Sequence, residues 1–284
     1  MNDQLLTPLD TLYEEEQGNS LPLPAALANL YGRLHIPPRA ERPHIIANFV
    51  TTLDGVVALN TSGKSGGGEI SGDNAHDRMV MGLLRAIADA VIVGAGTARA
   101  APRHMWTAEY IYPPLANAYG QLRAALGKTE PPLNVIVTAR GNVNLDQPVF
   151  QSGKVPVLIV TSEQGAQRIG QQPLPPHVQV QPVASAERIS PHSILDAVKW
   201  VRESEIILVE GGAHLLGDFF AGQCLDELFL TLAPQIAGRD GTVERPGLVM
   251  GRLFAPEHSL WGSLASVKRG GNHLFLRYRF ESKK

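Results

Sequence analysis

The sequence predicts an α/β fold in which a mainly parallel sheet is covered by helices on both faces. From His44 onward, short apolar runs of strand length alternate with segments of helical spacing, which is the pattern of successive βα units. The last such pattern, over residues 264–280, turns back at Gly270-Gly271-Asn272 and predicts an antiparallel hairpin at the end of the sheet. The chain has 284 residues, of which 44% are hydrophobic, so it can bury a full core without disulfides or metals.

In the first half of this pattern, one helix has the strongest support. Asp73 is its expected N-cap, and the helix is predicted over 75–88 because apolar residues recur at helical spacing. Those apolar residues are Met79, Val80, Leu83, Leu84 and Ile87. The other elements expected here are a strand over 45–50, a Gly/Ser-rich loop over 61–72, a short buried strand over 90–93 and a helix over 115–126.

The second half repeats strand and helix, and its strands are apolar runs bounded by polar or turn residues. Ser190 followed by Pro191 marks a helix start, since serine caps a helix and proline fits its first turn. That helix is expected to reach Arg202. The strands expected here cover residues 133–138, 155–161, 206–209 and 228–232.

Residues 1–43 are predicted to form an N-terminal extension of a domain that covers residues 44–284. The extension contains an acidic run at 14–16 and a Leu-Pro-Leu-Pro stretch at 21–24. A short helix is expected over 25–34. We expect this extension to be a surface arm that packs on the main domain.

Charge and cysteine content exclude several functional classes. The formal net charge is −2 and the basic residues are scattered, which argues against a nucleic-acid surface. The one cysteine, Cys224, is expected to be a small buried side chain, and it permits neither an internal disulfide nor a zinc site of paired cysteines. The nine histidines lack metal-binding spacing, no apolar stretch is long enough to span a membrane, and the polar N-terminus is unlike a secretory signal. The expectation is a cytoplasmic enzyme without a bound metal.

Two glycine-bearing turns at the ends of predicted strands point most directly to a function. The first contains Gly94 and Gly96, and the second contains Gly211 and Gly212 at the start of an apolar helical stretch. Glycine lets the backbone approach a ligand closely, and the free N–H groups at a helix start attract an anion. Two such turns on one sheet indicate a dinucleotide along the carboxyl ends of the strands.

Other phosphate-binding motifs match the chain less well. The G-x-G of the first turn could open a Rossmann fingerprint, but Arg99 occupies the place of the third glycine. The Gly-Lys-Ser run at 63–65 is similar to the end of a P-loop, but Ala58 stands where that motif needs its first glycine. For residues 62–68 we expect a mobile loop over a pocket instead.

Polar residues at two strand ends extend the candidate site. Thr138 and Arg140 end the strand over 133–138, where a hydroxyl and a guanidinium could hold the 2′-phosphate of NADP; the alternative is a solvated loop arginine. Ligands of α/β proteins bind at such strand ends, although an Asp-Gly pair alone also fits a simple turn. The residues at the exit of the first strand are Asn48, Thr51, Thr52, Asp54 and Gly55.

In their order along the chain, these segments resemble a known family. The pattern covers roughly residues 43–281 and is similar to the reductase domain of riboflavin biosynthesis, the C-terminal domain of the bifunctional deaminase–reductase. The resemblance implies the dihydrofolate reductase fold, a three-layer αβα sandwich. The segments are ANFVTTLDG at 47–55, LLRA at 83–86, DAVIVGAGT at 89–97, VEGG at 209–212 with Leu216, and LDEL at 225–228 with Ala233, Pro234 and Gly238.

The resemblance implies an NADPH-dependent reductase of a small pyrimidine substrate, usually a homodimer. In the family reaction, a hydride passes from nicotinamide C4 to C1′ of a ribosylamino-pyrimidine phosphate, and a ring-opened imine becomes a ribitylamine. It implies that Asn48, Thr52 and Arg85 bind the substrate, with Arg85 at its phosphate. No residue stands out as the general acid, and water and Asp54 are the two candidates for the proton donor. The residues implied to bind the cofactor are Gly94, Gly96, Thr97, Thr138, Arg140, Glu210, Gly211, Gly212, Leu215 and Leu216.

The substrate half of the chain departs from the family pattern. Bacterial members have, after G-x-G-T, an aspartate and then a second phosphate-binding arginine; the stretch 98–106 here lacks that aspartate, and Arg99 or Arg103 could substitute. The serine expected in the Gly-rich loop aligns near Gly67. Asn48 stands where many bacterial members have lysine, which is similar to the archaeal and fungal branch that reduces the pyrimidine before deamination.

Three functions are therefore open. The leading hypothesis is reduction of the phosphoribosylamino-pyrimidine of riboflavin synthesis. Reduction of dihydrofolate or another pterin would need an acidic residue that faces the pterin ring, for which Asp54 and Glu69 are the candidates. A non-catalytic nucleotide-binding protein of the same fold would keep the cofactor half and lack a working substrate site.

Overall fold

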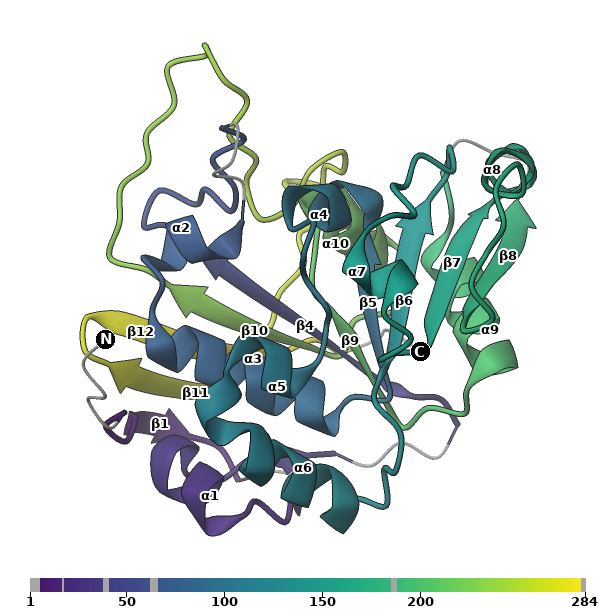
Figure 1. The fold of residues 1–284 in the computed structure, drawn as a ribbon. Helices are drawn as coiled ribbons and strands as arrows, with labels where there is room; N and C mark the ends of the chain where they lie inside the picture. Colours follow the sequence, from purple (N-terminus) through teal and green to yellow (C-terminus); the bar gives the residue numbers. More distant parts are fainter. Residues whose placement is uncertain (1–5, 17, 38–40, 62–65, 185–187, 282–284) are drawn as a thin grey trace.

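A ten-stranded sheet forms the centre of the computed structural model, which describes residues 6–16, 18–37, 41–61, 66–184 and 188–281. The strand order is β1-β11-β12-β10-β4-β9-β5-β6-β7-β8 (Figure 1). From β10 to β8 every strand is parallel to its neighbour, whereas β12, β11 and β1 continue the sheet antiparallel. The predicted mainly parallel sheet with antiparallel C-terminal strands is therefore confirmed. The strands of this sheet are β1 (Asp10–Glu14), β4 (His44–Thr51), β5 (Ala90–Gly94), β6 (Leu133–Thr138), β7 (Val157–Ser162), β8 (Val178–Ala184), β9 (Ile206–Val209), β10 (Glu227–Leu232), β11 (Ser263–Gly270) and β12 (His273–Arg279); β2 (Asn19–Ser20) and β3 (His35–Ile36) pair separately.

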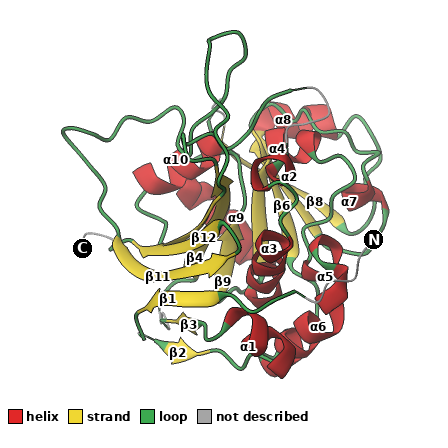
Figure 2. Ribbon diagram, turned by 90° about the vertical axis from the view of Figure 1, so that its left-hand side faces the viewer, coloured by secondary structure: helices red, strands yellow, loops and turns green. Residues whose placement is uncertain are grey.

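Helices cover both faces of the sheet, as predicted for a three-layer sandwich (Figure 2). One core lies under α1, α3 and α6 and contains Leu83 and Leu122; the other lies under α9 and α10 and contains Leu216 and Phe219. Among the described helices, none has the length and apolar character needed to cross a lipid bilayer. The helices are α1 (Ala25–Tyr31), α2 (Gly67–Ser71), α3 (Ala75–Ile87), α4 (Ala95–Ala100), α5 (Ala108–Ile111), α6 (Ala116–Ala125), α7 (Pro148–Gln151), α8 (Glu163–Ile169), α9 (Pro191–Val201) and α10 (Ala213–Ala221), with a 3₁₀ turn at Pro113–Leu115.

Helix α3 begins where the sequence predicts, but its cap is the neighbouring residue. The side chain of Asn74 accepts a hydrogen bond from the backbone N–H of Asp77 at 3.0 Å and therefore caps the helix. Asp73 was predicted as the cap, and this was wrong: its φ of 54° places it in the left-handed turn that ends α2.

The observed ends of one helix and one strand differ from the predicted ends for local reasons. The helix expected over 25–34 ends at Tyr31, because Gly32 has a φ of 88° and leaves the helical region. The strand expected to begin at residue 155 begins at Val157, because Pro156 has no N–H group to donate to a neighbouring strand.

The N-terminal segment contributes both a strand and core side chains. Strand β1 pairs antiparallel with β11 and forms one edge of the large sheet. Leu27 of α1 and Leu34 are 0% exposed and belong to the core on the α3 face. The segment before residue 44 therefore completes the sheet and the core beside it.

Candidate active site

The two glycine turns are in direct backbone contact at the carboxyl edge of the sheet. They follow β5 and β9, which are adjacent parallel strands. The N–H of Gly94 donates to the carbonyl of Gly211 at 2.8 Å, and a Cβ atom on Gly94 would lie 3.6 Å from the nitrogen of Gly212. Gly94 caps α4 and Gly212 caps α10, so both helix starts open at the same place. Free N–H groups at adjacent helix starts form a site for an anionic ligand.

Gly211 has a conformation and a neighbour that exclude a side chain. Its φ of +111° is rarely accessible to other residues, and a Cβ atom would lie 2.9 Å from the Thr97 hydroxyl oxygen. The peptide bond between Gly211 and Gly212 is cis. Gly96 is exposed one residue before Thr97. The structure thus brings Gly94, Thr97, Gly211 and Gly212 together, with Gly96 on the open side of α4.

Three arginines border the loop after β6, at this edge of the sheet. Arg99 of α4 donates to the carbonyl of Asn142 at 3.0 Å, and Arg168 of α8 donates to the carbonyl of Arg140 at 3.1 Å. Arg99, Arg140 and Arg168 are all exposed, whereas Thr138 is buried at the end of the strand. Three guanidinium groups around one short loop make this a favourable place for a phosphate group.

The side chains of Leu215 and Leu216 point into the protein. Both are buried in the core under α10, and Leu216 is 0% exposed. The backbone N–H of Leu216 donates to the carbonyl of Gly212 at 3.0 Å and continues the helix. These leucines therefore hold the start of α10 in place from below.

Glu210 and Arg85 form a buried ion pair beside the second glycine turn. The Nη2 atom of Arg85 lies 2.7 Å from Glu210 Oε2, and its Nε atom donates to the same carboxylate at 3.0 and 3.1 Å. The Nη1 atom donates to the carbonyl of Thr107 at 3.2 Å. The two side chains are 2% and 5% exposed. Sequence reasoning assigned Arg85 to the substrate and Glu210 to the cofactor, and the structure places them against each other.

Asp54 joins the exit of β4 to the loop after β10. Its carboxylate accepts hydrogen bonds from the Thr52 hydroxyl at 2.6 Å and from the backbone N–H groups of Ala237 and Gly238 at 3.0 and 2.7 Å. The Thr52 hydroxyl, followed by the N–H of Ala237, lowers the pKa of Asp54 to about 2. At neutral pH the group is ionised and carries no proton to donate.

Asp77 is a buried acid that sequence reasoning missed. It lies in the first turn of α3 and is 4% exposed. Burial, with a smaller contribution from the nearby charge of Glu210, raises its pKa to about 6. The sequence does contain a signal: Asp77 precedes Val80 by three residues and so lies on the apolar stripe of α3.

Asn48 lies within β4, before the exit of the strand. It is 7% exposed and lines a small cavity together with Tyr31, Val80 and Thr231. The cavity volume of about 10 Å³ is near the lower limit for one water molecule. Asn48 therefore faces the interior under α3, on the same side of the sheet as Asp77.

The stretch 98–106 is packed partly by aromatic side chains. The His104 ring lies 5.3 Å from that of Trp106 and 4.7 Å from that of Tyr110. Burial lowers the pKa of His104 to about 2, so this ring is neutral. Arg103 is exposed and its carbonyl accepts from the Tyr110 hydroxyl at 2.8 Å. The Gly-Lys-Ser run at 63–65 lies outside the described residues.

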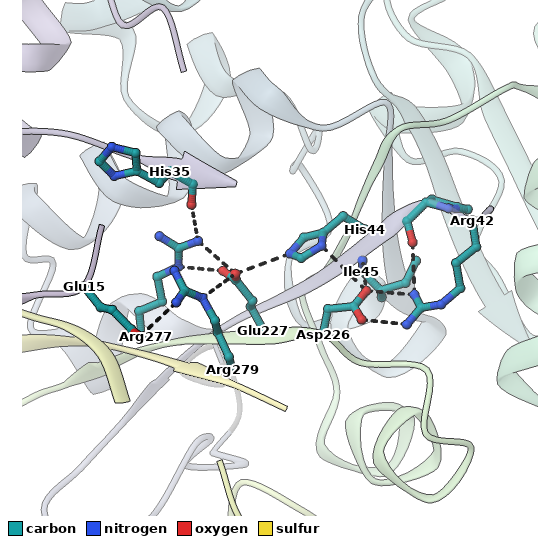
Figure 3. Close-up of polar contacts among 10 residues, drawn as sticks. Glu15, His35, Arg42, His44, Ile45, Asp226, Glu227, Arg277 and Arg279 are labelled. Carbon is teal, nitrogen blue, oxygen red and sulfur yellow. Dashed lines mark hydrogen bonds and ion pairs between the residues drawn. The ribbon is translucent and has the colours of Figure 1, made fainter. Parts of the chain in front are cut away.

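A second cluster of charges lies at the amino ends of β4 and β10 (Figure 3). Arg277 donates to Glu227 at 2.5 and 2.9 Å, and Arg279 bridges Glu227 and Glu15. The His44 ring lies between Glu227, at 3.5 Å, and Asp226, at 3.9 Å. Burial tends to raise the pKa of Glu227, but His44 and Arg277 outweigh it and hold that pKa below its usual range. Because these charges are matched within the protein, the cluster is a structural anchor.

Comparison with known proteins gives one family model, described as the RibD C-terminal domain, which matches residues 43–256. A curated relative from Methanothermobacter thermautotrophicus, 2,5-diamino-6-ribosylamino-4(3H)-pyrimidinone 5′-phosphate reductase, is 27% identical over 198 residues, or 69% of this chain and 80% of the relative.

Solved structures have the same fold at lower sequence identity. A pyrimidine reductase-like protein from Corynebacterium diphtheriae superposes with a TM-score of 0.64 at 22% identity, covering 85% of this chain and 93% of that one. A diaminohydroxyphosphoribosylaminopyrimidine deaminase/5-amino-6-(5-phosphoribosylamino)uracil reductase from Thermotoga maritima gives 0.61 at 22% identity, covering 85% of this chain. The chain spans 57% of the length of that bifunctional protein.

Proposed function

The chain belongs to the RibD C-terminal domain family, and from this premise we propose that it is an NADPH-dependent pyrimidine reductase of riboflavin biosynthesis. The observation that carries the proposal is the contact between the two glycine turns, which opens two helix starts at one point of the sheet edge. The name of the archaeal relative supports a ribosylamino-pyrimidine phosphate as substrate.

The glycine turns are the proposed site of the cofactor pyrophosphate. Gly94, Gly96, Gly211 and Gly212 leave the backbone open to the phosphates, and the Thr97 hydroxyl lies beside Gly211. The absence of a Cβ atom at Gly211 is what keeps this cradle open, so the residues present fit such a group. When bound, the cofactor supplies the hydride, and the protein's task is to bind and orient the two reactants.

Preference for NADPH over NADH is the proposed role of the loop after β6. Arg140 is exposed there, and Arg99 and Arg168 hold the loop by hydrogen bonds to its carbonyl groups. The three positive charges favour the adenosine 2′-phosphate, which NADH lacks. Thr138, buried at the end of β6, would shape the loop from below.

The substrate is proposed to lie between the exit of β4 and the start of α3. Thr52 and Asp54 would fix this wall through the hydrogen bonds that join them to the loop at 237–238. Arg85 would hold Glu210 at the boundary between cofactor and substrate; a direct contact with the substrate phosphate would require the ion pair to open. Asn48 would support the floor of the site from the interior.

Turnover of purified protein tests this function. NADPH oxidation would be followed with the diamino and the deaminated ribosylamino-pyrimidine phosphates, each supplied separately, and with dihydrofolate in a third reaction. Turnover of one pyrimidine supports the proposal and identifies the order of reduction and deamination. Turnover of dihydrofolate alone would replace the pyrimidine by a pterin, and tight NADPH binding without any turnover would favour a non-catalytic nucleotide-binding protein.

We also propose that the active form is a homodimer. Leu253 and Trp261 are 86% and 87% exposed, and Leu260 is 40% exposed in the same segment before β11. Large apolar side chains that gather on a surface often mark an interface. Sedimentation of the protein before and after Trp261→Ser would test the role of this segment.

The division of the chain into an extension over residues 1–43 and a domain over residues 44–284 is also a proposal. So is a cytoplasmic location, which cell fractionation would test.

A further inference from the structure

A larger cavity lies at the opposite edge of the sheet from the two glycine turns. Its volume of about 550 Å³ is within the range of small-molecule pockets. The end of α10, the residues before β10, the segment before β11 and the end of β12 form its walls. Because β10 is parallel to β4, and β4 and β5 are both parallel to β9, the cavity lies at the amino edge of these strands. The glycine turns follow the carboxyl ends of β5 and β9, so this cavity is separate from the candidate active site.

Aromatic and aliphatic side chains form much of the cavity wall. The rings of Phe220 and Phe280 meet edge to face, with their centroids 5.0 Å apart, and Leu225 beside them is 3% exposed. A Cβ atom on Gly262 would lie 2.9 Å from Cε1 of Phe280, so the segment that carries Trp261 runs close against this ring. Trp261 also lines the cavity and is 87% exposed, which leaves its indole ring open to a ligand.

The charged groups of the lining give the cavity an excess of negative charge. Glu257 and Glu281 are both exposed in the lining, and neither forms an ion pair with any residue that the structure describes. The arginine of the lining, Arg279, is already bound to the carboxylates of Glu227 and Glu15. The end of α10 borders the cavity too, and the carboxyl-terminal end of a helix carries a partial negative charge.

We propose that this cavity binds an organic cation, in which an ammonium or guanidinium group is attached to an apolar or aromatic body. The cationic group would interact with Glu257, Glu281 and the Trp261 indole ring, since carboxylates and aromatic faces both attract a cation. The apolar body would contact Phe220 and Phe280. A bare metal ion fits this lining less well, because aromatic and aliphatic walls supply few of the oxygen ligands that it needs.

Binding of a simple probe to the full-length protein tests the proposal. Benzyltrimethylammonium has a cationic group and an aromatic body, and its Kd can be measured by ligand-observed NMR titration. The titration is made at about pH 8, where a histidine such as His258 of the lining is ordinarily neutral. The cation should bind saturably and roughly tenfold more tightly than neutral benzyl alcohol, and anionic benzoate should bind least. Equal binding of the three compounds would contradict the charge argument.

Substitutions at exposed positions of the lining identify where the probe binds. Trp261→Leu removes the indole ring and should raise the Kd of the cation by roughly 3- to 30-fold. Glu257→Gln combined with Glu281→Gln removes both charges and should raise it by roughly 3- to 10-fold. Glu203→Gln, at an exposed glutamate outside the cavity, is the matched control and should leave the Kd unchanged. If the lining variants bind the cation as the wild type does, the probe binds elsewhere and the proposal is wrong.

Trp261 also belongs to the segment proposed to join two copies of the chain, and one further variant separates the two roles. Leu253 lies in the same segment and is 86% exposed, but it does not line the cavity. Leu253→Ser should weaken self-association in sedimentation and leave the Kd of the cation unchanged. If the cation binds only after Leu253→Ser has separated the copies, a second copy fills the cavity and the proposal is overturned. None of these outcomes depends on the reductase function, because the readout is binding of the probe alone.

Discussion

Asp54 and Asp77 are two carboxyl groups with opposite environments. Asp54 accepts hydrogen bonds from one hydroxyl and two backbone N–H groups, so its ionised form is stabilised. Asp77 is withdrawn from water and has a carboxylate nearby, so its neutral form is favoured, although the side chains of Thr231 and Ser71 partly oppose this. The two environments move the pKa values apart, to about 2 for Asp54 and about 6 for Asp77.

Asp77 should also reduce the stability of the protein at alkaline pH. Its folded-state pKa of about 6 lies above the ordinary value of 3.8, so the folded protein holds this proton more tightly than the unfolded chain does. Stability is then lost as pH rises from 3.8 through about 6. Thermal unfolding of Asp77→Asn should show a gain on the order of 2–3 kcal/mol at pH 8 and little change near pH 4. A gain of equal size at both pH values would show that the effect is unrelated to ionisation.

Arg140 is the residue on which cofactor preference should depend. Arg140→Ala removes a charged donor to the 2′-phosphate, so the Kd for NADPH should rise by roughly 10- to 100-fold while that for NADH changes little. Fluorescence titration with the two cofactors measures this difference. Lys199→Ala, which removes an exposed positive charge from α9, is the control. Equal effects of Arg140→Ala on both cofactors would contradict the assignment.

At the scale of the elements, the second glycine turn should be sensitive to substitution. Gly211→Val places a branched side chain at a φ of +111° and against the Thr97 hydroxyl, so the turn must move. NADPH binding should be abolished, with the folded state retained in circular dichroism. Gly120→Ala in α6, where a Cβ atom meets nothing within 4 Å, should leave binding intact. Unchanged NADPH affinity in Gly211→Val would exclude this turn as the pyrophosphate site.

The elements that the sequence predicted well are those with a local signal. The alternation of apolar strands and amphipathic helices identified the parallel sheet, and Gly270-Gly271 marked the hairpin of β11 and β12. Strand β8 has the sequence VQVQPVA, which mixes polar residues and a proline because it forms an edge of the sheet, and no strand was expected there. Strand β1 is also an edge strand, and its pairing with β11 joins residues more than 250 positions apart, which no local pattern encodes.

The candidate site was predictable in its backbone features and less so in its side chains. Glycines that open a helix after an apolar strand can be identified in the sequence by their type and spacing. The structure places both glycine turns side by side. The pairing of Arg85 with Glu210 depends on how α3 packs across β9, and the acidity of Asp77 depends on its burial against β10. Both are consequences of tertiary packing, so the sequence shows the residues but not their partners.

At the scale of the whole molecule, the charge cluster around Glu227 joins the two ends of the chain. Arg277 and Arg279 of β12 bind Glu227 of β10, Arg279 also binds Glu15, and Arg277 donates to the carbonyl of His35 (Figure 3). The N-terminal segment, the last strand and the centre of the sheet are therefore joined by one network of ion pairs and hydrogen bonds around Glu227.

Glu227→Ala should consequently destabilise the whole fold. The substitution leaves the buried Arg277 and the partly exposed Arg279 without their common carboxylate and should lower the free energy of unfolding by roughly 3–5 kcal/mol. Urea denaturation, followed by circular dichroism, measures the loss. The control is Glu16→Ala, which breaks an ion pair with Arg33 whose side chains are 63% and 68% exposed, and which should cost less than about 1 kcal/mol. Similar losses in both variants would mean that the buried cluster adds no special stability.

The Arg85–Glu210 pair also has a consequence for how this site can evolve. Either residue alone would leave an isolated charge in a place that is almost closed to water. A lineage that replaces one of them is expected to replace the other as well, so the two positions should covary among homologues. They lie 125 residues apart in the chain, so their covariation would reveal the contact between α3 and the second glycine turn from sequences alone.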